Sequence, residues 1–364
     1  MDDVTELAHR LVSVPSHEDE TAAGDLIENW LRDETDADVT RDDAPNGGNV
    51  VARKGDGDTV LALVGHHDVV PPDDSQMDGD DYVVYEEDGR LYGRGAADMK
   101  GAVAAAMVAF RDADPDCELH FCSFVGEEIG GTGARHFLSE NPAPDHAVVA
   151  EGSTSYTTEG VTDVAVAHRG RRASTITASG TASHASEPEA GENAIYRGAD
   201  AVDVVRELDV PTVSVLGHDV SGSVVVTEIE GGSAWNVVPA SCTITVDERT
   251  VPGERADLEA VEEIAGVEWT VDQDLPPMAC SDDAFADAVL DAADAAQDGT
   301  PNHVVKPHAT DAGWLGDAGT ACVVCGAAEP AQAHTKDESV SLDTLDTCYE
   351  IYRGLANEWP VRQD

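Results

Sequence analysis

The chain has 364 residues, enough for two domains, and carries 73 acidic against 21 basic residues, a formal net charge of -52. Nucleic acids and anionic membranes both require basic surfaces, so we expect neither as a partner. The acids are spread along the whole sequence. Their repulsion is screened at molar salt, where the Debye length falls to about 3 Å, which predicts adaptation to a salt-filled cytoplasm.

No targeting segment is recognisable. The first residues carry no basic region, and no run approaches the ~20 apolar residues that span a bilayer. The seven cysteines form no repeated framework, so we predict a cytoplasmic protein without disulfides. Cys322 and Cys325 have the spacing of a redox or zinc-knuckle motif. They lie in an apolar run without a second pair, which favours two buried strand cysteines.

The first 150 residues alternate between helical and strand patterns. Helices are predicted over 3–11 and about 18–32, the second with one apolar face. Residues 73–88 form an acidic loop, and residues 99–111 are apolar on all sides, which predicts a buried helix. The strands expected in this part are 49–53, 60–64, 119–125 and 147–150. Such alternation is typical of an α/β domain with a mainly parallel sheet.

Near residue 171 the pattern changes to the order βαββαβ, which is the split ferredoxin-like arrangement. Its predicted elements are strands 173–179, 223–230, 241–249 and 267–271, and helices 193–208 and 254–265. The first domain then resumes with a helix, a strand and a closing helix, at 283–296, 320–325 and 342–355. We therefore predict a catalytic domain made of residues 1–171 and 277–364, interrupted by an inserted α+β domain at 172–276.

Acidic and histidine side chains follow several of the predicted strands. In an open α/β sheet, ligands bind outside the carboxyl ends of the strands, so these side chains are expected to gather in one site. They are His66, Glu127, Glu128, Glu151 and His334. Asp98 lies among small residues at 91–101, which let a ligand approach closely. Alone, that stretch is explained equally well by a glycine-rich loop that caps a helix.

Together these residues form a set of candidate metal ligands. Zinc binds histidine nitrogen and carboxylate oxygen, and two zinc ions ~3.5–4 Å apart need a bridging carboxylate. The candidate ligands, two for each ion plus one shared acid, are His66, Asp98, Glu128, Glu151 and His334. Glu127 is left over as a general base. Asp68 lies two residues after His66, where it can accept the second N–H of that imidazole.

At this point the sequence resembles a known family. It is similar to the co-catalytic zinc metallopeptidases and deacylases, which include succinyl-diaminopimelate desuccinylase, acetylornithine deacetylase, aminoacylase and glutamate carboxypeptidase. The similarity covers nearly the whole chain, and its matching segments are 65–71, 93–101, 126–130 and 150–152. The resemblance implies two zinc ions, with cobalt or manganese as alternatives, and supports Glu127 as both base and acid.

The resemblance also assigns the ligands. It implies that Asp98 bridges the two ions. His66 and Glu151 hold one of them, and Glu128 and His334 hold the other. A cis peptide bond is implied after Asp98.

Two departures from the family pattern matter. His67 stands where the family more often has a small hydroxyl residue, which leaves His67 as an alternative ligand. We prefer His66, because only it has an aspartate two residues further on. The loop after Pro72 lacks the family's usual glycine and tryptophan, so substrate entry is expected to differ there.

The inserted domain carries three further matches. His184 resembles the family's lid histidine, which polarises the scissile carbonyl, although a surface histidine explains it equally. Asn236 lies in an Asn-x-x-Pro element, and Arg249 resembles the arginine that binds a substrate carboxylate. Arg249 also has acidic neighbours that could pair with it. Arg171 and Asp311 are weaker candidates for substrate contacts.

The predicted function is a zinc-dependent amidohydrolase that removes the acyl group of an N-acyl amino acid with metal-activated water. The motifs look most like succinyl-diaminopimelate desuccinylase of lysine biosynthesis, with acetylornithine deacetylase of arginine biosynthesis next. Glu151, where family dipeptidases have Asp, favours deacylases and carboxypeptidases. A broader aminoacylase or metallo-carboxypeptidase is the alternative. A non-catalytic binding homologue would have lost a ligand or the base, and none is lost.

The resemblance finally implies a homodimer through the inserted domain. An exposed edge of its sheet would be covered by pairing. His184 would then serve the partner's metals, whereas in a monomer it would fold over its own.

Overall fold

The computed structural model describes residues 2–360, which form two compact units. Unit 1 contains the residues up to Ala167, the segment Met278–Lys306 and the residues from Thr310 onward. Unit 2 contains His168–Pro277 and Pro307–Ala309. The chain thus leaves unit 1 after Ala167, returns at Met278, and contributes the short segment Pro307–Ala309 to unit 2 before it completes unit 1.

Unit 1 is built on a nine-stranded sheet. Its strands are β1 (Asp38–Arg41), β2 (Val50–Lys54), β3 (Val60–His66), β8 (Glu118–Phe124), β9 (His146–Val149), β10 (Val164–His168), β19 (Met278–Ala279), β20 (His303–Lys306) and β21 (Ala321–Val324). The order is β1-β2-β8-β3-β9-β21-β10-β19, and β20 pairs with β10. The central strands β8, β3, β9 and β21 run parallel. Strands β2 and β10 pair antiparallel with β8 and β21, and β1 pairs antiparallel with β2. The expected α/β fold with a mainly parallel central sheet is confirmed.

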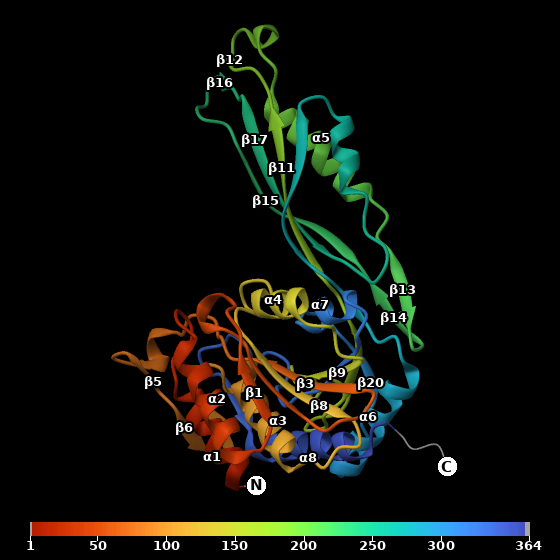
Figure 1. The fold of residues 1–364 in the computed structure, drawn as a ribbon. Helices are drawn as coiled ribbons and strands as arrows, with labels where there is room; N and C mark the ends of the chain where they lie inside the picture. Colours follow the sequence, from red (N-terminus) through yellow and green to blue (C-terminus); the bar gives the residue numbers. More distant parts are fainter. Residues whose placement is uncertain (1, 361–364) are drawn as a thin grey trace. The chain divides into compact units, whose positions relative to one another are not determined.

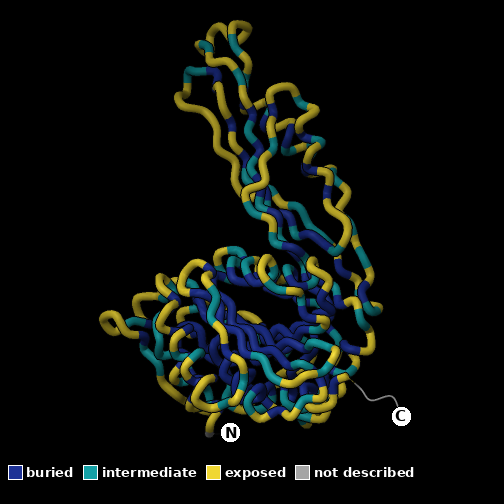
Figure 2. Tube along the Cα trace, in the orientation of Figure 1, coloured by how far each residue is buried: buried dark blue, intermediate teal, exposed yellow. Residues whose placement is uncertain are grey.

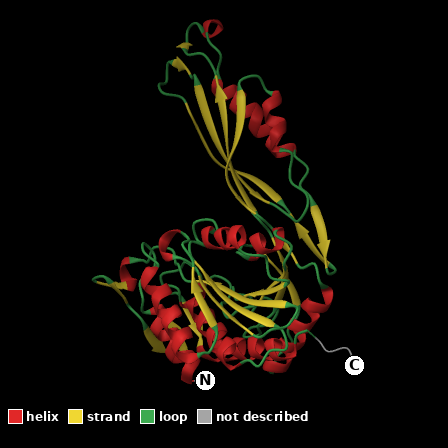
Figure 3. Ribbon diagram, viewed as in Figure 1, coloured by secondary structure: helices red, strands yellow, loops and turns green. Residues whose placement is uncertain are grey.

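Helices cover both faces of this sheet (Figures 1 and 3). They are α1 (Asp2–Val12), α2 (Thr21–Glu34), α3 (Gly101–Asp112), α4 (Thr132–Glu140), α6 (Asp283–Ala296), α7 (Ala312–Asp317) and α8 (Leu342–Glu358). Helices α1, α3 and α8 pack on one face, and α4 and α7 on the other. Every residue from 101 to 110 of α3 is buried, as the apolar pattern predicted. Figure 2 shows the buried strands between the two helical layers.

Small hairpins complete unit 1. They are built from β4 (Met77–Asp78), β5 (Asp81–Tyr82), β6 (Tyr85–Glu87), β7 (Arg90–Tyr92) and β22 (Ser339–Ser341). Strand β7 lies between β6 and β22, so a segment from the end of the chain pairs directly with the one that leads into Asp98.

Unit 2 is a four-stranded antiparallel sheet packed against one helix. The strands, in the order β15-β17-β11-β18, are β15 (Ser223–Gly231), β17 (Ser241–Arg249), β11 (Arg171–Ser179) and β18 (Val267–Leu275). Helix α5 (Ala194–Glu207) covers one face of the sheet. Alternate residues such as Ile176 and Ile244 face the core, whereas Thr175 and Thr243 lie on the other face.

One predicted helix of unit 2, at 254–265, is wrong. The structure has only the short 3-10 helix Leu258–Glu263 there. The backbone of Ala256 is held by two side chains, because its N–H donates to Glu248 (2.9 Å) and its carbonyl accepts from Arg172 (2.8 Å). In an α-helix over 254–265 this carbonyl would accept from Ala260, whose N–H donates instead to the carbonyl of Asp257 (3.3 Å), and the α-helix does not form.

Several elements were not predicted from the sequence. They include β1, β10, β19, β20, β22, α7 and the short strands β4 to β7 in unit 1. In unit 2 they include the hairpins of β13 (Thr212–Val215) with β14 (His218–Ser221) and β12 (Ser183–His184) with β16 (Val237–Val238). Cys322 and Cys325 are buried in or directly after β21, and all seven cysteines are free and buried. Within residues 2–360 no helix is both long and apolar enough to cross a membrane.

Candidate metal centre

The predicted metal ligands of unit 1 meet at the carboxyl edge of its sheet. Strand β3 ends at His66, which is in register with Phe124 at the end of the parallel strand β8. Glu128 follows β8, and Glu151 follows β9 by two residues. Parallel strands bring their carboxyl ends to one edge, so residues far apart in the sequence become neighbours.

Asp98 lies between two clusters of ligands. Its Oδ1 is 3.1 Å from Nε2 of His66, and its Oδ2 is 3.1 Å from Nε2 of His334. Glu151 Oε1 is 3.4 Å from the His66 nitrogen, and Glu128 Oε1 is 2.9 Å from the His334 nitrogen. We call His66, Asp98 and Glu151 the inner cluster, and Asp98, Glu128 and His334 the outer cluster.

The donors of both clusters fit divalent metal ions. In each, one imidazole nitrogen and two carboxylate oxygens lie within 4.8 Å of one another. The two carboxylates of each cluster repel one another unless a cation lies between them. Nitrogen and oxygen donors of this kind suit zinc, and also cobalt and manganese.

Asp68 connects the inner cluster with the loop that follows β8. Its Oδ1 is 3.2 Å from Nδ1 of His66, on the side of the ring opposite to Asp98. The same carboxylate accepts the backbone N–H groups of Glu127 (3.1 Å) and Glu128 (3.0 Å). These bonds and the imidazole keep the pKa of Asp68 low although burial acts in the opposite direction. Asp68 therefore fixes one histidine and two glutamates at once.

Glu20 and Asn49, which the sequence analysis missed, hold the same loop. Asn49 Oδ1 accepts the N–H of Val125 (3.1 Å), and Glu20 Oε2 accepts the N–H of Gly126 (3.1 Å). With the two bonds to Asp68, four consecutive backbone donors end on side-chain acceptors. Burial and the Asp68 charge raise the pKa of Glu20 to about 8. No local pattern distinguishes Glu20 from the other acids of this chain.

Glu338, also missed, holds the segment of Asp98. Its Oε1 accepts the backbone N–H groups of Ala97 (3.0 Å) and Asp98 (3.1 Å), and its Oε2 accepts from Arg94 (2.5 Å). Both partners of the Arg94–Glu338 pair are buried. The peptide bond between Asp98 and Met99 is cis, as the resemblance implied.

Glu127 has a strongly perturbed environment. Burial raises its pKa well above the usual value, and the neighbouring carboxylates of Asp311, Glu151 and Glu128 act in the same direction. Burial likewise raises the pKa of Asp311 to about 7. His67 lies outside both clusters: its Nδ1 is 2.8 Å from Ser123 Oγ, and burial lowers its pKa to about 3.

Of the three site residues predicted in unit 2, two lie together and the third lies far along the sheet. His184 lies in β12 beside Asn236, whose carbonyl accepts the N–H of Ala185 (2.9 Å). Arg249 lies at the far end of β17, eight residues or roughly 26 Å beyond the start of that strand. Its Nε donates to Asp247 (2.8 Å), which also accepts from Arg171 (2.7 Å). The structure therefore brings His184 and Asn236 together but not Arg249.

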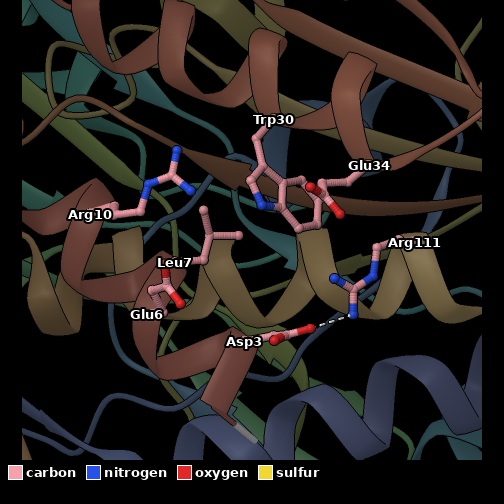
Figure 4. A pocket seen from close by; sticks show the side chains of 7 residues that line it. All are labelled: Asp3, Glu6, Leu7, Arg10, Trp30, Glu34 and Arg111. Atoms are coloured by element: carbon pink, nitrogen blue, oxygen red, sulfur yellow. Dashed lines mark hydrogen bonds and ion pairs between the residues drawn. The ribbon is translucent and has the colours of Figure 1, made fainter.

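Unit 1 also contains a pocket (Figure 4). It measures about 160 Å³ and lies among α1, α2 and the end of α3. The Arg111 guanidinium pairs with Asp3 (2.9 Å) and lies over Trp30, 5.6 Å from the ring centre. None of the candidate site residues lines it.

The fold and the two clusters define the class of metal-dependent hydrolases with a dinuclear site. The family model of peptidase family M20/M25/M40 matches residues 62–358, and the chain belongs to this family.

Solved structures share the fold over nearly the whole chain. An aminopeptidase PepT from Bacillus cereus superposes with a TM-score of 0.81 at 19% identity, covering 98% of each chain. An M20 family metallo-carboxypeptidase from Sulfolobus solfataricus gives 0.76 at 15% identity over 100% of both chains. A Bacillus subtilis protein described as a dinuclear metal binding peptidase from M20 family gives 0.70 at 17%, covering 97% of this chain and 96% of the other. At these identities the likeness concerns the fold.

Proposed function

We propose that this member of the M20 family hydrolyses the amide bond of an N-acyl amino acid at a site that holds two metal ions. The observation that carries the proposal is Asp98, whose two carboxylate oxygens contact two different histidines. A carboxylate shared in this way suits a pair of ions. Zinc is the metal we expect, with cobalt or manganese as substitutes.

The geometry of the two clusters supports the ligand assignment that the family resemblance implies. His66 and Glu151 would hold one ion, Glu128 and His334 the other, and Asp98 both. Bound metal ions supply Lewis acidity, which polarises the amide carbonyl and lowers the pKa of water.

Glu127 is the residue we assign to proton transfer. It is fixed next to the ligand Glu128 by its backbone bond to Asp68, and it belongs to neither cluster. It accepts the proton of the attacking water and delivers it to the leaving amine.

His184 is proposed to donate a hydrogen bond to the developing oxyanion. Its Nδ1 lies 2.7 Å from Ser186 Oγ and accepts the backbone N–H of Ser186 (3.2 Å), an arrangement that favours a ring proton on Nε2. The side chain is exposed, so Nε2 is available as a donor.

We also propose a homodimer formed through unit 2. Strand β15 is an edge of its sheet, and Val225 and Ile229 on it are 53% and 51% exposed. An apolar groove of about 480 Å³ lies between α5 and β15, lined by residues such as Val205 and Leu208. A second copy of this edge would pair with it and cover these side chains.

Subunit exchange distinguishes action within one chain from action across the dimer. His184→Ala and Glu127→Ala are each expected to be inactive. If His184 serves the partner's site, a mixed dimer contains one intact site and activity returns. A mixture that stays inactive, although mass spectrometry shows exchange, would exclude action across the dimer.

For the substrate, we favour N-succinyl-diaminopimelate or N-acetylornithine, and Arg249 and Asn236 as contacts to its polar groups. The second candidate is a broader aminoacylase or metallo-carboxypeptidase, which the glutamate at position 151 equally allows. A non-catalytic binding homologue is the most distant alternative.

One panel of assays tests these alternatives. The purified protein, loaded with zinc, cobalt or manganese, is offered N-succinyl and N-acetyl derivatives of diaminopimelate, ornithine, lysine and glutamate, together with di- and tripeptides. We expect the highest kcat/KM on an N-acyl amino acid. Preference for peptides would move the assignment to a peptidase. Metal-loaded protein without any hydrolysis would support the binding homologue.

A further inference from the structure

Lys306 is a buried cation beside the inner cluster that the proposed mechanism does not use. It ends strand β20 and is only 7% exposed. Its Nζ donates to the carbonyl of Gly152 (2.8 Å) and lies 3.4 Å from Oε2 of Glu151. A buried ammonium group is costly unless it is paired, and these two acceptors supply the pairing.

The two oxygens of Glu151 therefore face different partners. Oε1 lies 3.4 Å from Nε2 of His66, inside the inner cluster. Oε2 is directed to Lys306. In the outer cluster, the corresponding carboxylate of Glu128 forms an ion pair with His334 and, within residues 2–360, with no lysine or arginine.

We infer that Lys306 is a positioning residue that restricts Glu151 to a one-oxygen contact with the ion of the inner cluster. The inference rests on the proposed metal-binding function. A carboxylate that binds through both oxygens occupies two coordination positions, whereas a catalytic ion needs one position for water or substrate. By engaging Oε2, Lys306 keeps that position open.

The charge of Lys306 has a second consequence. An ammonium group close to the inner cluster repels a dication there and offsets part of the attraction of the carboxylates. Removing this charge should therefore tighten metal binding. A lysine that only supported the local fold would have the opposite effect, because its loss would loosen Glu151 and weaken binding.

Cobalt binding in a His334→Ala background tests the inference, since this background leaves the inner cluster complete. The variants are Lys306→Met, Lys306→Gln, which keeps a donor for the Gly152 carbonyl, and Lys306→Arg, which keeps the charge. Lys54→Met is the matched control, because Lys54 also donates to backbone carbonyls, those of Arg111 and Ala113, but touches neither cluster. Affinity is measured by chelator competition, and coordination by the visible absorption of the bound Co²⁺.

We expect Lys306→Met and Lys306→Gln to bind Co²⁺ at least about tenfold more tightly than the parent. Their d–d absorption should become weaker, as a higher coordination number requires. Lys306→Arg and Lys54→Met should match the parent in both measurements. Unchanged or weaker affinity in Lys306→Gln, or an unchanged spectrum, would overturn the inference. Wild-type protein that binds no Co²⁺ would instead refute the metal-binding function itself, and the inference with it.

Discussion

The inner and outer clusters share Asp98 but differ in how they are embedded. His66 of the inner cluster is 1% exposed, lies at the end of a central strand and is fixed by Asp68. The side chain of His334 in the outer cluster is 51% exposed and comes from a loop, with a backbone φ of 64°. The inner cluster is thus anchored to the framework of the sheet through His66, whereas the outer cluster takes its histidine from a loop.

Replacement of Asp98, which both clusters share, should remove metal binding from both of them. In Asp98→Ala both clusters lose the carboxylate that lies between their histidines, and the two ions would face each other without an anion. We expect loss of both metals and of all measurable hydrolysis, measured by elemental analysis and a rate assay. Two tightly bound ions in this variant would refute the bridging role.

Replacement of the base should leave both clusters intact. Glu127→Ala removes no ligand, so the protein should keep its fold and both metals while turnover falls ~10²–10⁴-fold. Metal content and kcat are measured on the same preparation. Retention of more than about a tenth of the rate would remove Glu127 from proton transfer.

Glu338→Gln should weaken both clusters to the same degree, because Glu338 holds the backbone of their common residue. We expect metal affinity to fall ~10–100-fold, the usual cost of losing a group that orients a ligand. Glu329→Gln is the control, since Glu329 also pairs with an arginine, Arg90 (2.9 Å), in the same part of the unit. An equal loss in both variants would show a general effect on the fold.

Limited chelation should separate the two clusters without any mutation. A chelator reaches the exposed His334 more easily than the buried His66. The metal content should therefore fall in two steps, with a plateau at one ion for each chain, and the remaining ion should be absent from His66→Ala. Loss of both ions in a single step would contradict the contrast between the clusters.

The salt concentration should change the stability of the fold but not the difference between the inner and outer clusters. At ~0.1 M salt the Debye length grows to about 10 Å, and the acids behind the net charge of -52 repel over longer distances. We expect a lower melting temperature at low salt for both the wild type and Glu127→Ala. A melting temperature independent of salt would contradict the predicted adaptation to salt.

The sequence predicted the parts of the site that follow strands. His66, Glu128 and Glu151 were found because apolar runs end just before them, and parallel strands end at one edge. Glu20, Glu338 and Lys306 were missed because their partners are distant in the sequence and no local pattern marks them.

Contacts between residues distant in the sequence also explain the errors in the predicted fold. The apolar pattern predicted α2, which buries one face, and α3, which is buried on all sides. It failed at 254–265, where Arg172 binds the backbone carbonyl of Ala256 that an α-helix would use. Side chains that replace backbone partners leave no periodic signal.

The division of unit 1 into segments before and after unit 2 has a consequence for biosynthesis. The ribosome makes His66, Asp98 and Glu151 early, but His334 and Glu338 only after all of unit 2 up to Pro277 has been made. Helix α8, which packs against α3, follows later still. A growing chain therefore cannot complete the outer cluster before unit 2 has been synthesised. Premature termination within unit 2 yields a fragment that contains every residue of the inner cluster but lacks His334 of the outer one.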